Sequence, residues 1–244
     1  MNQPINLTNR QIQILKAAIE EYIETAFPVG SETLDKKYNL GVSPATIRNE
    51  MVRLTTQGYL QQPHTSAGRT PSPQALRYYV SHLLKQKDLS VAEEVAVKEK
   101  VWDKRHKLDQ LLREATVVVA QKANSLSLIT TEEGDIYYAG TGNILRFPEF
   151  YDIDLTRRLF LLLEEFEYWR KLFFTEHGES DFKVIVGDEI GVNFDSCGLV
   201  YIRFKIPRHG DGSISVIGSN RLDYAYVIPL LQYMKGLITE ISSA

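Results

Sequence analysis

The stretch from residue 43 to residue 58, SPATIRNEMVRLTTQG, constrains this chain most, because it specifies a short helix with two chemically different faces. Ser43 is a good N-cap, Pro44 suits the first helical position, and Gly58 is a natural stop. Apolar residues at helical spacing predict a buried stripe, made of Ile47, Met51 and Leu54. A second face at the same spacing carries Ala45, Arg48, Asn49 and Val52.

The second face has the chemistry needed to read the major groove of DNA. Arg48 can bond guanine, Asn49 can pair with adenine, and the short side chain of Ala45 lets the helix approach base edges. An ordinary surface helix can carry the same residues, so the interpretation depends on the neighbouring segments.

The residues before this helix favour a DNA-binding interpretation. Thr8 and Gln11 form a capping box that opens a helix with apolar residues at helical spacing. The turn at residues 28–30 ends it, and Ser31 is expected to cap a second short helix. A tight turn at residues 39–42 then leads into the helix described above. Two short helices joined by a Gly-containing turn predict a helix-turn-helix.

The residues after this helix predict a hairpin with a basic tip. A short strand at residues 59–62 leads into the polar loop PHTSAGRTP, and a third helix begins near Pro73. This order is that of a winged helix, with Arg69 expected in the minor groove or on phosphate. A plain hairpin, or an Arg69 paired with an acidic neighbour, is the alternative.

Within the preceding helix, Glu50 would repel phosphate, so we expect it to form a local ion pair.

The predicted DNA contacts divide by role. Hydroxyls at helix N-termini and in the loop favour phosphate, whereas the outward face of the helix favours bases. The residues are Ser31, Ser43, Pro44, Ala45, Thr46, Arg48, Asn49, His64, Thr65, Ser66 and Arg69.

Charge and composition fit a two-domain regulator. Residues 1–85 carry nine Lys and Arg against six Asp and Glu, whereas the remainder carries nineteen against twenty-five. A DNA-binding domain with a small positive net charge, joined to an acidic second domain, suits a protein that must release DNA. A single cysteine excludes an internal disulfide framework. The sequence shows neither the pattern of a secretory signal peptide nor an apolar run long enough to span a membrane. A cytoplasmic location is therefore expected.

The rest of the chain predicts a helical segment and an α+β domain. We expect domains at residues 1–87 and 125–244, joined by a helical linker at 88–124. The linker's apolar stripe needs a partner surface, either its own domain or a second protomer. In the last domain, strands are expected at 126–131, 136–138, 182–186, 199–206 and 213–217, and helices at about 154–173 and 223–241.

Longer motifs resemble one family. EEYIETAFPVGS, ATIRNEM and QPHTSAGRTP look like the DNA-binding domain of the HrcA family of bacterial heat-inducible transcription repressors. GTGNILRFPEF, VGDE and GSISVIGSNRLDYAYVI resemble that family's GAF-like domain. Family members are normally longer, and much of their central dimerisation insert is missing here. The usual Gly-Pro-Thr-Arg-Met run is replaced by the residues Gly218, Ser219, Asn220, Arg221 and Leu222.

The resemblance implies a homodimeric repressor. It would bind an inverted-repeat operator upstream of chaperone genes, depend on a GroE-type chaperonin, and be released by heat. The alternative is a regulator whose GAF-like domain senses a small metabolite; an open, polar pocket would favour it and a filled one would not. The polar residues near the GAF-like motifs are expected to form caps, turns or ion pairs: Asn143, Glu149, Arg221, Asp223 and Tyr224.

Neither an enzyme nor a metalloprotein is predicted. The five histidines are scattered without acidic or cysteine partners at metal-ligand spacing, and Cys197 lies in an apolar strand where an inert thiol is expected. The residues Gly187 to Gly191 lack the ending of a phosphate-binding loop. We therefore expect no metal, cofactor or catalytic residues.

Overall fold

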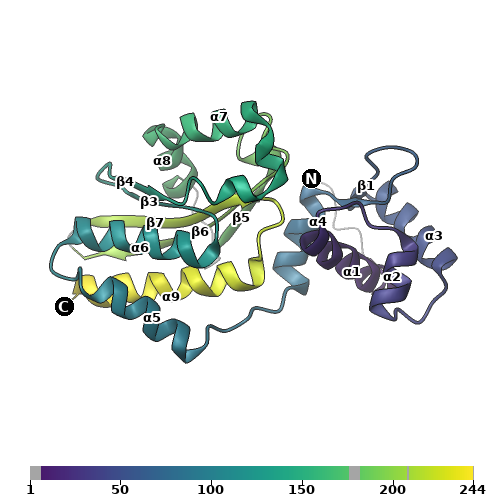
Figure 1. Ribbon diagram of the computed structural model, residues 1–244, viewed down its shortest axis with the longest axis horizontal. Helices are drawn as coiled ribbons and strands as arrows, with labels where there is room; N and C mark the ends of the chain where they lie inside the picture. Colours follow the sequence, from purple (N-terminus) through teal and green to yellow (C-terminus); the bar gives the residue numbers. More distant parts are fainter. Residues whose placement is uncertain (1–6, 176–181, 208, 244) are drawn as a thin grey trace. The chain divides into compact units, whose positions relative to one another are not determined.

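The chain divides into two compact units, Met1–Leu84 and Lys85–Ala244. The computed structural model describes residues 7–175, 182–207 and 209–243 (Figure 1). Each unit is considered by itself below.

The first unit consists of helices followed by a two-stranded hairpin and a final helix (Figure 1). Its elements are α1 (Asn9–Thr25), α2 (Ser31–Tyr38), α3 (Pro44–Thr56), β1 (Leu60–Gln61), β2 (Thr70–Pro71), α4 (Pro73–Tyr78) and the π-helical turn η1 (Tyr79–Leu83). β1 and β2 are antiparallel, with Leu60 opposite Pro71.

Local signals set where these helices begin. The capping box that opens α1 is present, since the Gln11 amide donates to Thr8 Oγ1 at 3.3 Å and the Thr8 amide donates to Gln11 Oε1 at 2.9 Å. At α4 the cap is simpler: Ser72 is the N-cap, and its Oγ accepts from the Ala75 amide at 3.2 Å. The apolar faces of these helices and the hairpin meet in a core that includes Ile14, Leu15, Ile19, Leu34, Ile47, Leu54, Leu60 and Leu76.

The second unit is built on one five-stranded antiparallel sheet, in the order β4-β3-β7-β6-β5. The strands are β3 (Leu126–Thr131), β4 (Ile136–Ala139), β5 (Lys183–Val186), β6 (Cys197–Ile206) and β7 (Gly210–Ser219). β6 and β7 pair over their full lengths, from Cys197 opposite Ser219 to Ile206 opposite Gly210. The unit belongs to the expected α+β class.

Helices cover both faces of this sheet (Figure 1). α6 (Leu108–Ala123) and α9 (Tyr224–Ser243) lie on one face, and α5 (Val91–Trp102) packs against both of them. The other face is covered by α7 (Ile153–Leu163) and α8 (Phe166–Phe174). The short 3₁₀ turns are η2 (Ile144–Arg146), η3 (Pro148–Tyr151) and η4 (Gly187–Glu189).

Two long helices expected from the sequence are each interrupted. The segment 88–124 is not one helix between two domains but the hairpin α5–α6, with a break at residues 103–107, and it belongs to the second unit. The hairpin buries most of the predicted apolar stripe within the unit, whereas Val95 stays 49% exposed. The buried members are Val101, Leu111, Leu112, Ala115, Val118 and Val119. The helix expected over 154–173 is likewise broken between Leu163 and Phe166.

None of the helices formed by the described residues is both long and apolar enough to cross a lipid bilayer. Nor do three or more His, Cys, Asp or Glu side chains among them gather in a way that would hold a metal ion.

Candidate nucleic-acid interface

The N-terminus of α3 is built as its sequence predicts. Ser43 is the N-cap, and its Oγ accepts a hydrogen bond from the Thr46 amide at 3.2 Å. The Ser43 and Thr46 hydroxyls lie 3.0 Å apart, so each is already a partner of the other. Pro44 occupies the first turn, and Gly58 follows the helix with a φ of +82°. The helix therefore begins and ends where its caps indicate.

The two faces of α3 separate as expected. Ile47, Met51 and Leu54 are buried in the core of the unit. The opposite side exposes Ala45, Arg48, Asn49 and Val52. The side chains of Arg48 and Asn49 form no hydrogen bond or ion pair with any described residue. The outward face thus offers one cationic and one amide side chain whose bonding capacity is unused.

Glu50 forms the local ion pair that the sequence predicts. Its side chain is nearly buried, and its Oε1 accepts from the Arg53 guanidinium at 2.9 Å. Arg53 is therefore partly committed to the helix, in contrast to Arg48. Pairing also offsets the negative charge that Glu50 would otherwise present beside the exposed face.

The hairpin loop, residues 62–69, is organised by a side chain that the sequence analysis did not single out. The Gln62 side-chain amide donates to Thr65 O at 2.9 Å and to Ala67 O at 3.0 Å. The Ala67 amide also donates to His64 O at 2.9 Å. These bonds hold the exposed residues His64, Thr65 and Ser66 in a defined turn.

Arg69 does not lie at the tip of this loop but at its base. Its amide donates to Val29 O, and its carbonyl accepts from the Val29 amide, both at 2.8 Å. Its Nε donates to Thr55 Oγ1 on α3 at 3.0 Å. Arg69 therefore joins the hairpin to both α3 and the α1–α2 connection. The sequence did not predict this position, because it depends on packing between segments that are distant in the chain.

Gly68 allows this close approach. A Cβ at this position would lie 2.5 Å from Val29 O and 2.8 Å from the Pro28 carbonyl carbon. No other residue fits without displacing the loop, since real Cβ contacts do not occur at such distances. The only sequence signal was a glycine within a motif, and its role depends on a contact across about forty residues.

Ser31 also differs from its predicted role. The N-cap of α2 is Gly30, which makes no side-chain cap, and Ser31 is the first helical residue and is nearly buried. Its side chain lines a groove of ≈ 370 Å³ between α2, α3 and the hairpin loop. Five predicted contacts meet in this groove: Ser31, Arg48, Thr65, Ser66 and Arg69. The other six, from α3 and His64, are not part of its lining.

Polar residues in the second unit have structural partners. The Arg221 guanidinium donates to Glu149 Oε1 at 2.7 Å and to Oε2 at 3.0 Å, and Ser219 Oγ donates to Oε1 at 2.9 Å. Burial raises the pKa of Glu149, but the hydrogen bonds from Arg221 and Ser219 outweigh it and hold that pKa below its ordinary value. The Asn143 amide bonds the carbonyls of Ala120 and Ser125. The expectation of structural roles for Glu149, Arg221 and Asn143 is confirmed.

The space between the sheet and α7–α8 is occupied by the protein's own side chains. Fully or almost fully buried members of this core include Phe150, Leu159, Trp169, Phe173, Leu199 and Tyr201. Cys197 belongs to the same core, and burial raises the pKa of its thiol to about 12, which suits an inert residue. Among the described residues, side chains of the protein itself therefore fill the space between the sheet and α7–α8.

The comparisons with known proteins identify the family. Residues 45–228 match the family model described as the HrcA protein C terminal domain, which covers most of this chain. The chain belongs to the HrcA family.

Curated relatives that match this chain belong to the same family. The "Heat-inducible transcription repressor HrcA" of Pelotomaculum thermopropionicum is 26% identical, covering 97% of this chain and 97% of that protein. The HrcA protein of Symbiobacterium thermophilum is 45% identical over 124 residues, which are 51% of this chain and 36% of that protein. The first alignment runs over 338 positions, more than the 244 residues present here, so that relative carries internal residues without counterparts.

A solved structure has the same fold over almost the whole chain. A protein described as "a hypothetical protein" covers 98% of this chain and 99% of its own, with a TM-score of 0.78 and 18% identity. At that identity the likeness concerns the fold alone.

Proposed function

We propose that this HrcA-family protein is a sequence-specific transcription repressor that binds an inverted-repeat operator upstream of heat-shock genes as a homodimer. Relatives that cover nearly its full length are named heat-inducible transcription repressors. The proposal includes a cytoplasmic location and no enzymatic activity.

The outward face of α3 is the observation that carries the proposal. Arg48 and Asn49 are exposed and unpaired among the described residues, and Ala45 beside them is small. Arg bonds the O6 and N7 acceptors of guanine, and Asn bonds N6 and N7 of adenine. We assign base reading to Ala45, Arg48 and Asn49 on this basis.

The remaining contacts are proposed to hold phosphate. The first unit would act as a winged helix-turn-helix, with α2 and α3 as the two helices and residues 62–69 as the wing. The uncapped N-terminus of α2 leaves backbone amides near Ser31 that favour an anion. The wing adds His64, Thr65 and Ser66, whereas Arg69 would reach phosphate only from the base of the wing. Pro44 presets the first turn of α3 beneath Ser43 and Thr46.

A dimer follows from the geometry of DNA. One reading helix contacts only a few base pairs, and two readers related by a two-fold axis match an inverted repeat. Binding would weaken with salt, because each phosphate contact releases counterions.

Heat release is proposed to act through folding. The second unit, which we propose is GAF-like, would be a marginally stable element whose folded population falls with temperature or without a GroE-type chaperonin. Operator binding that is unchanged across a heat-shock ramp, with folding reversible throughout, would exclude this switch.

A metabolite sensor receives less support. Aromatic and aliphatic side chains fill the described space between the sheet and α7–α8, where a ligand of the second unit would need room. The polar residues Glu149 and Arg221 are bonded to each other.

The test is selection of bound sequences from random DNA, followed by titration of the selected repeat. We expect an inverted repeat, a stoichiometry of two chains per duplex, and loss of binding when the repeat is scrambled. Equal affinity for the scrambled duplex would show that the protein binds nucleic acid without sequence specificity, and it would refute the proposal.

A further inference from the structure

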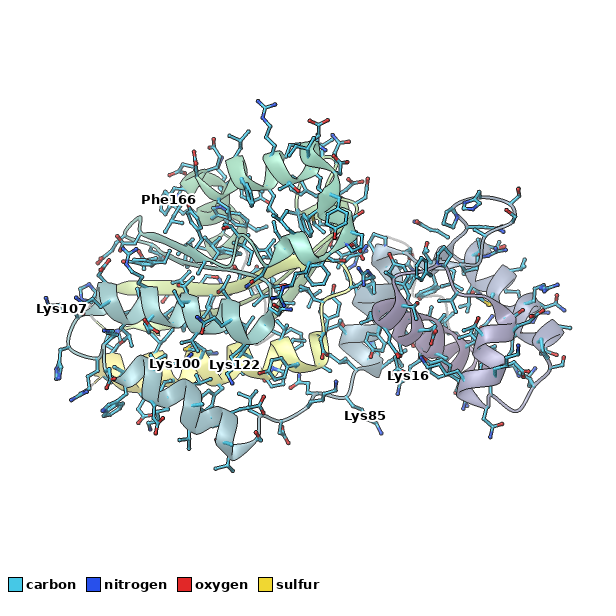
Figure 2. All side chains as sticks on the ribbon, in the orientation of Figure 1. Lys16, Lys85, Lys100, Lys107, Lys122 and Phe166 are labelled. Carbon is cyan, nitrogen blue, oxygen red and sulfur yellow. The ribbon has the colours of Figure 1, made fainter. Side chains whose placement is uncertain are left out.

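Val52 is the large apolar member of the outward face of α3. It is 47% exposed, whereas Ile47 and Leu54 of the same helix are fully buried. A β-branched side chain loses rotamer freedom in a helix, and the partial burial of Val52 within its own unit offsets only part of this loss. Its exposed methyl groups are available to a partner on this face, where side chains of α3 project away from the other helices of the unit (Figure 2).

Helical geometry places Val52 one turn beyond the two residues that are proposed to read bases. Val52 follows Arg48 by four positions and Asn49 by three, so all three lie on one side of α3. At about 1.5 Å of rise per residue, Val52 lies about 6 Å from Arg48 and about 4.5 Å from Asn49 along the helix axis. Successive bases of a DNA strand are about 3.4 Å apart. A major groove that admits Arg48 and Asn49 therefore brings Val52 against a base one or two steps away.

The surroundings of Val52 combine apolar and polar groups. Val52 lines the groove of ≈ 370 Å³ between α2, α3 and the hairpin loop. Met51 and Ala67 add apolar surface to the same groove, and Thr65 and Ser66 add hydroxyl groups. Burial of a methyl group is favourable where apolar atoms meet it, and Val52, Met51 and Ala67 supply such atoms.

We propose that Val52 determines specificity for thymine by contacting its C5-methyl group in the major groove. That methyl group is the apolar feature by which the major groove distinguishes thymine from the other bases. The remaining base edges are hydrogen-bond donors and acceptors, and a valine that covers them removes water without replacing its hydrogen bonds. Val52 therefore favours thymine and also disfavours a base that presents an unpaired polar group at this position.

This inference rests on the proposed function and adds one base to the operator that it describes. Arg48 and Asn49 account for a guanine and an adenine, whereas neither side chain can recognise a methyl group. Each half-site would then contain a thymine one or two base pairs from the position at which Arg48→Ala relaxes the base preference.

The test removes methyl groups from the DNA and from the protein separately. Each thymine in a half-site of the selected repeat is replaced by uracil, one at a time, which deletes only the C5-methyl group. Fluorescence anisotropy titrations then give the affinity of the full-length wild type, Val52→Ala and Val192→Ala for each duplex. Val192→Ala is the matched control, since it shortens in the same way a valine of the second unit that is 80% exposed.

We expect one thymine whose replacement by uracil weakens binding of the wild type and of Val192→Ala about fourfold, as burial of one methyl-sized group implies. Val52→Ala should bind the thymine and uracil duplexes with equal affinity at that position. Far-UV circular dichroism checks that Val52→Ala is folded, which is expected because alanine has a higher helix propensity than valine.

Two results would overturn the inference and leave the proposed repressor intact. One is a wild type that binds the repeat specifically but shows no effect of uracil at any thymine. The other is a uracil effect that Val52→Ala retains or that Val192→Ala also loses, since the effect would then not depend on Val52. A wild type that does not distinguish the repeat from its scrambled form would instead refute the proposed function, and the thymine contact with it.

Discussion

Gly68→Ala is the sharpest perturbation of the proposed DNA-binding surface. The added Cβ would lie 2.5 Å from Val29 O, so the loop must move away from the α1–α2 connection. That movement stretches the two 2.8 Å hydrogen bonds between Val29 and Arg69. Each such bond contributes about 0.5–1.5 kcal/mol, which gives an expected loss of about 1–3 kcal/mol of local stability.

Amide hydrogen exchange measures this loss where it occurs. Protection of the Val29 and Arg69 amides should fall about 5- to 150-fold, since 1.4 kcal/mol corresponds to tenfold. Affinity for the operator should fall as well, because Thr65, Ser66 and Arg69 move with the loop.

Gly142→Ala is the matched control, since a Cβ at Gly142 meets nothing within 4 Å. It should leave both the exchange of these two amides and DNA binding unchanged. If Gly68→Ala kept wild-type protection at Val29 and Arg69, the close packing of the loop would not hold in solution, and the reasoning from it would be wrong.

Three further predictions concern charge. Arg48→Ala should cost about 1–3 kcal/mol of operator binding and relax the base preference at one base pair. Arg53→Ala removes an arginine that is paired with Glu50 and should keep that base preference, so equal selection profiles for the two variants would refute the base contact of Arg48. Arg69→Ala should weaken binding to all sequences to a similar degree, and a change of preferred bases in selected DNA would contradict a phosphate role. Glu149 has a lowered pKa in the folded protein, so its stabilising contribution is complete above about pH 4.5 and is lost as the pH falls through the lower folded value. Glu149→Gln should therefore flatten the acid limb of the unfolding curve measured by urea titration, and an unaltered acid limb would show that another group dominates.

The sequence alone determined the local parts of the DNA-binding surface. The Thr8–Gln11 capping box, the Ser43 cap and the stripe that includes Ile47 act over three or four residues, and the structure contains each of them. The Glu50–Arg53 ion pair belongs to the same class, since i,i+3 neighbours on a helix lie close enough to pair. The sequence also led us to expect structural roles for Asn143 and Glu149, but not which residues they would bond.

Only the tertiary structure decided how distant segments meet. It placed Arg69 at the base of the loop, made Gly68 sterically necessary and buried Ser31, because each depends on contacts with residues far along the chain. It also divided the segment 88–124 into α5 and α6, since folding back buries an apolar stripe that one extended helix would leave in water. Periodicity gives the face of a helix but not its partner, which is why the sequence left open what covers the stripe of residues 88–124 and the folded unit shows most of it buried on α5, α6 and their neighbours.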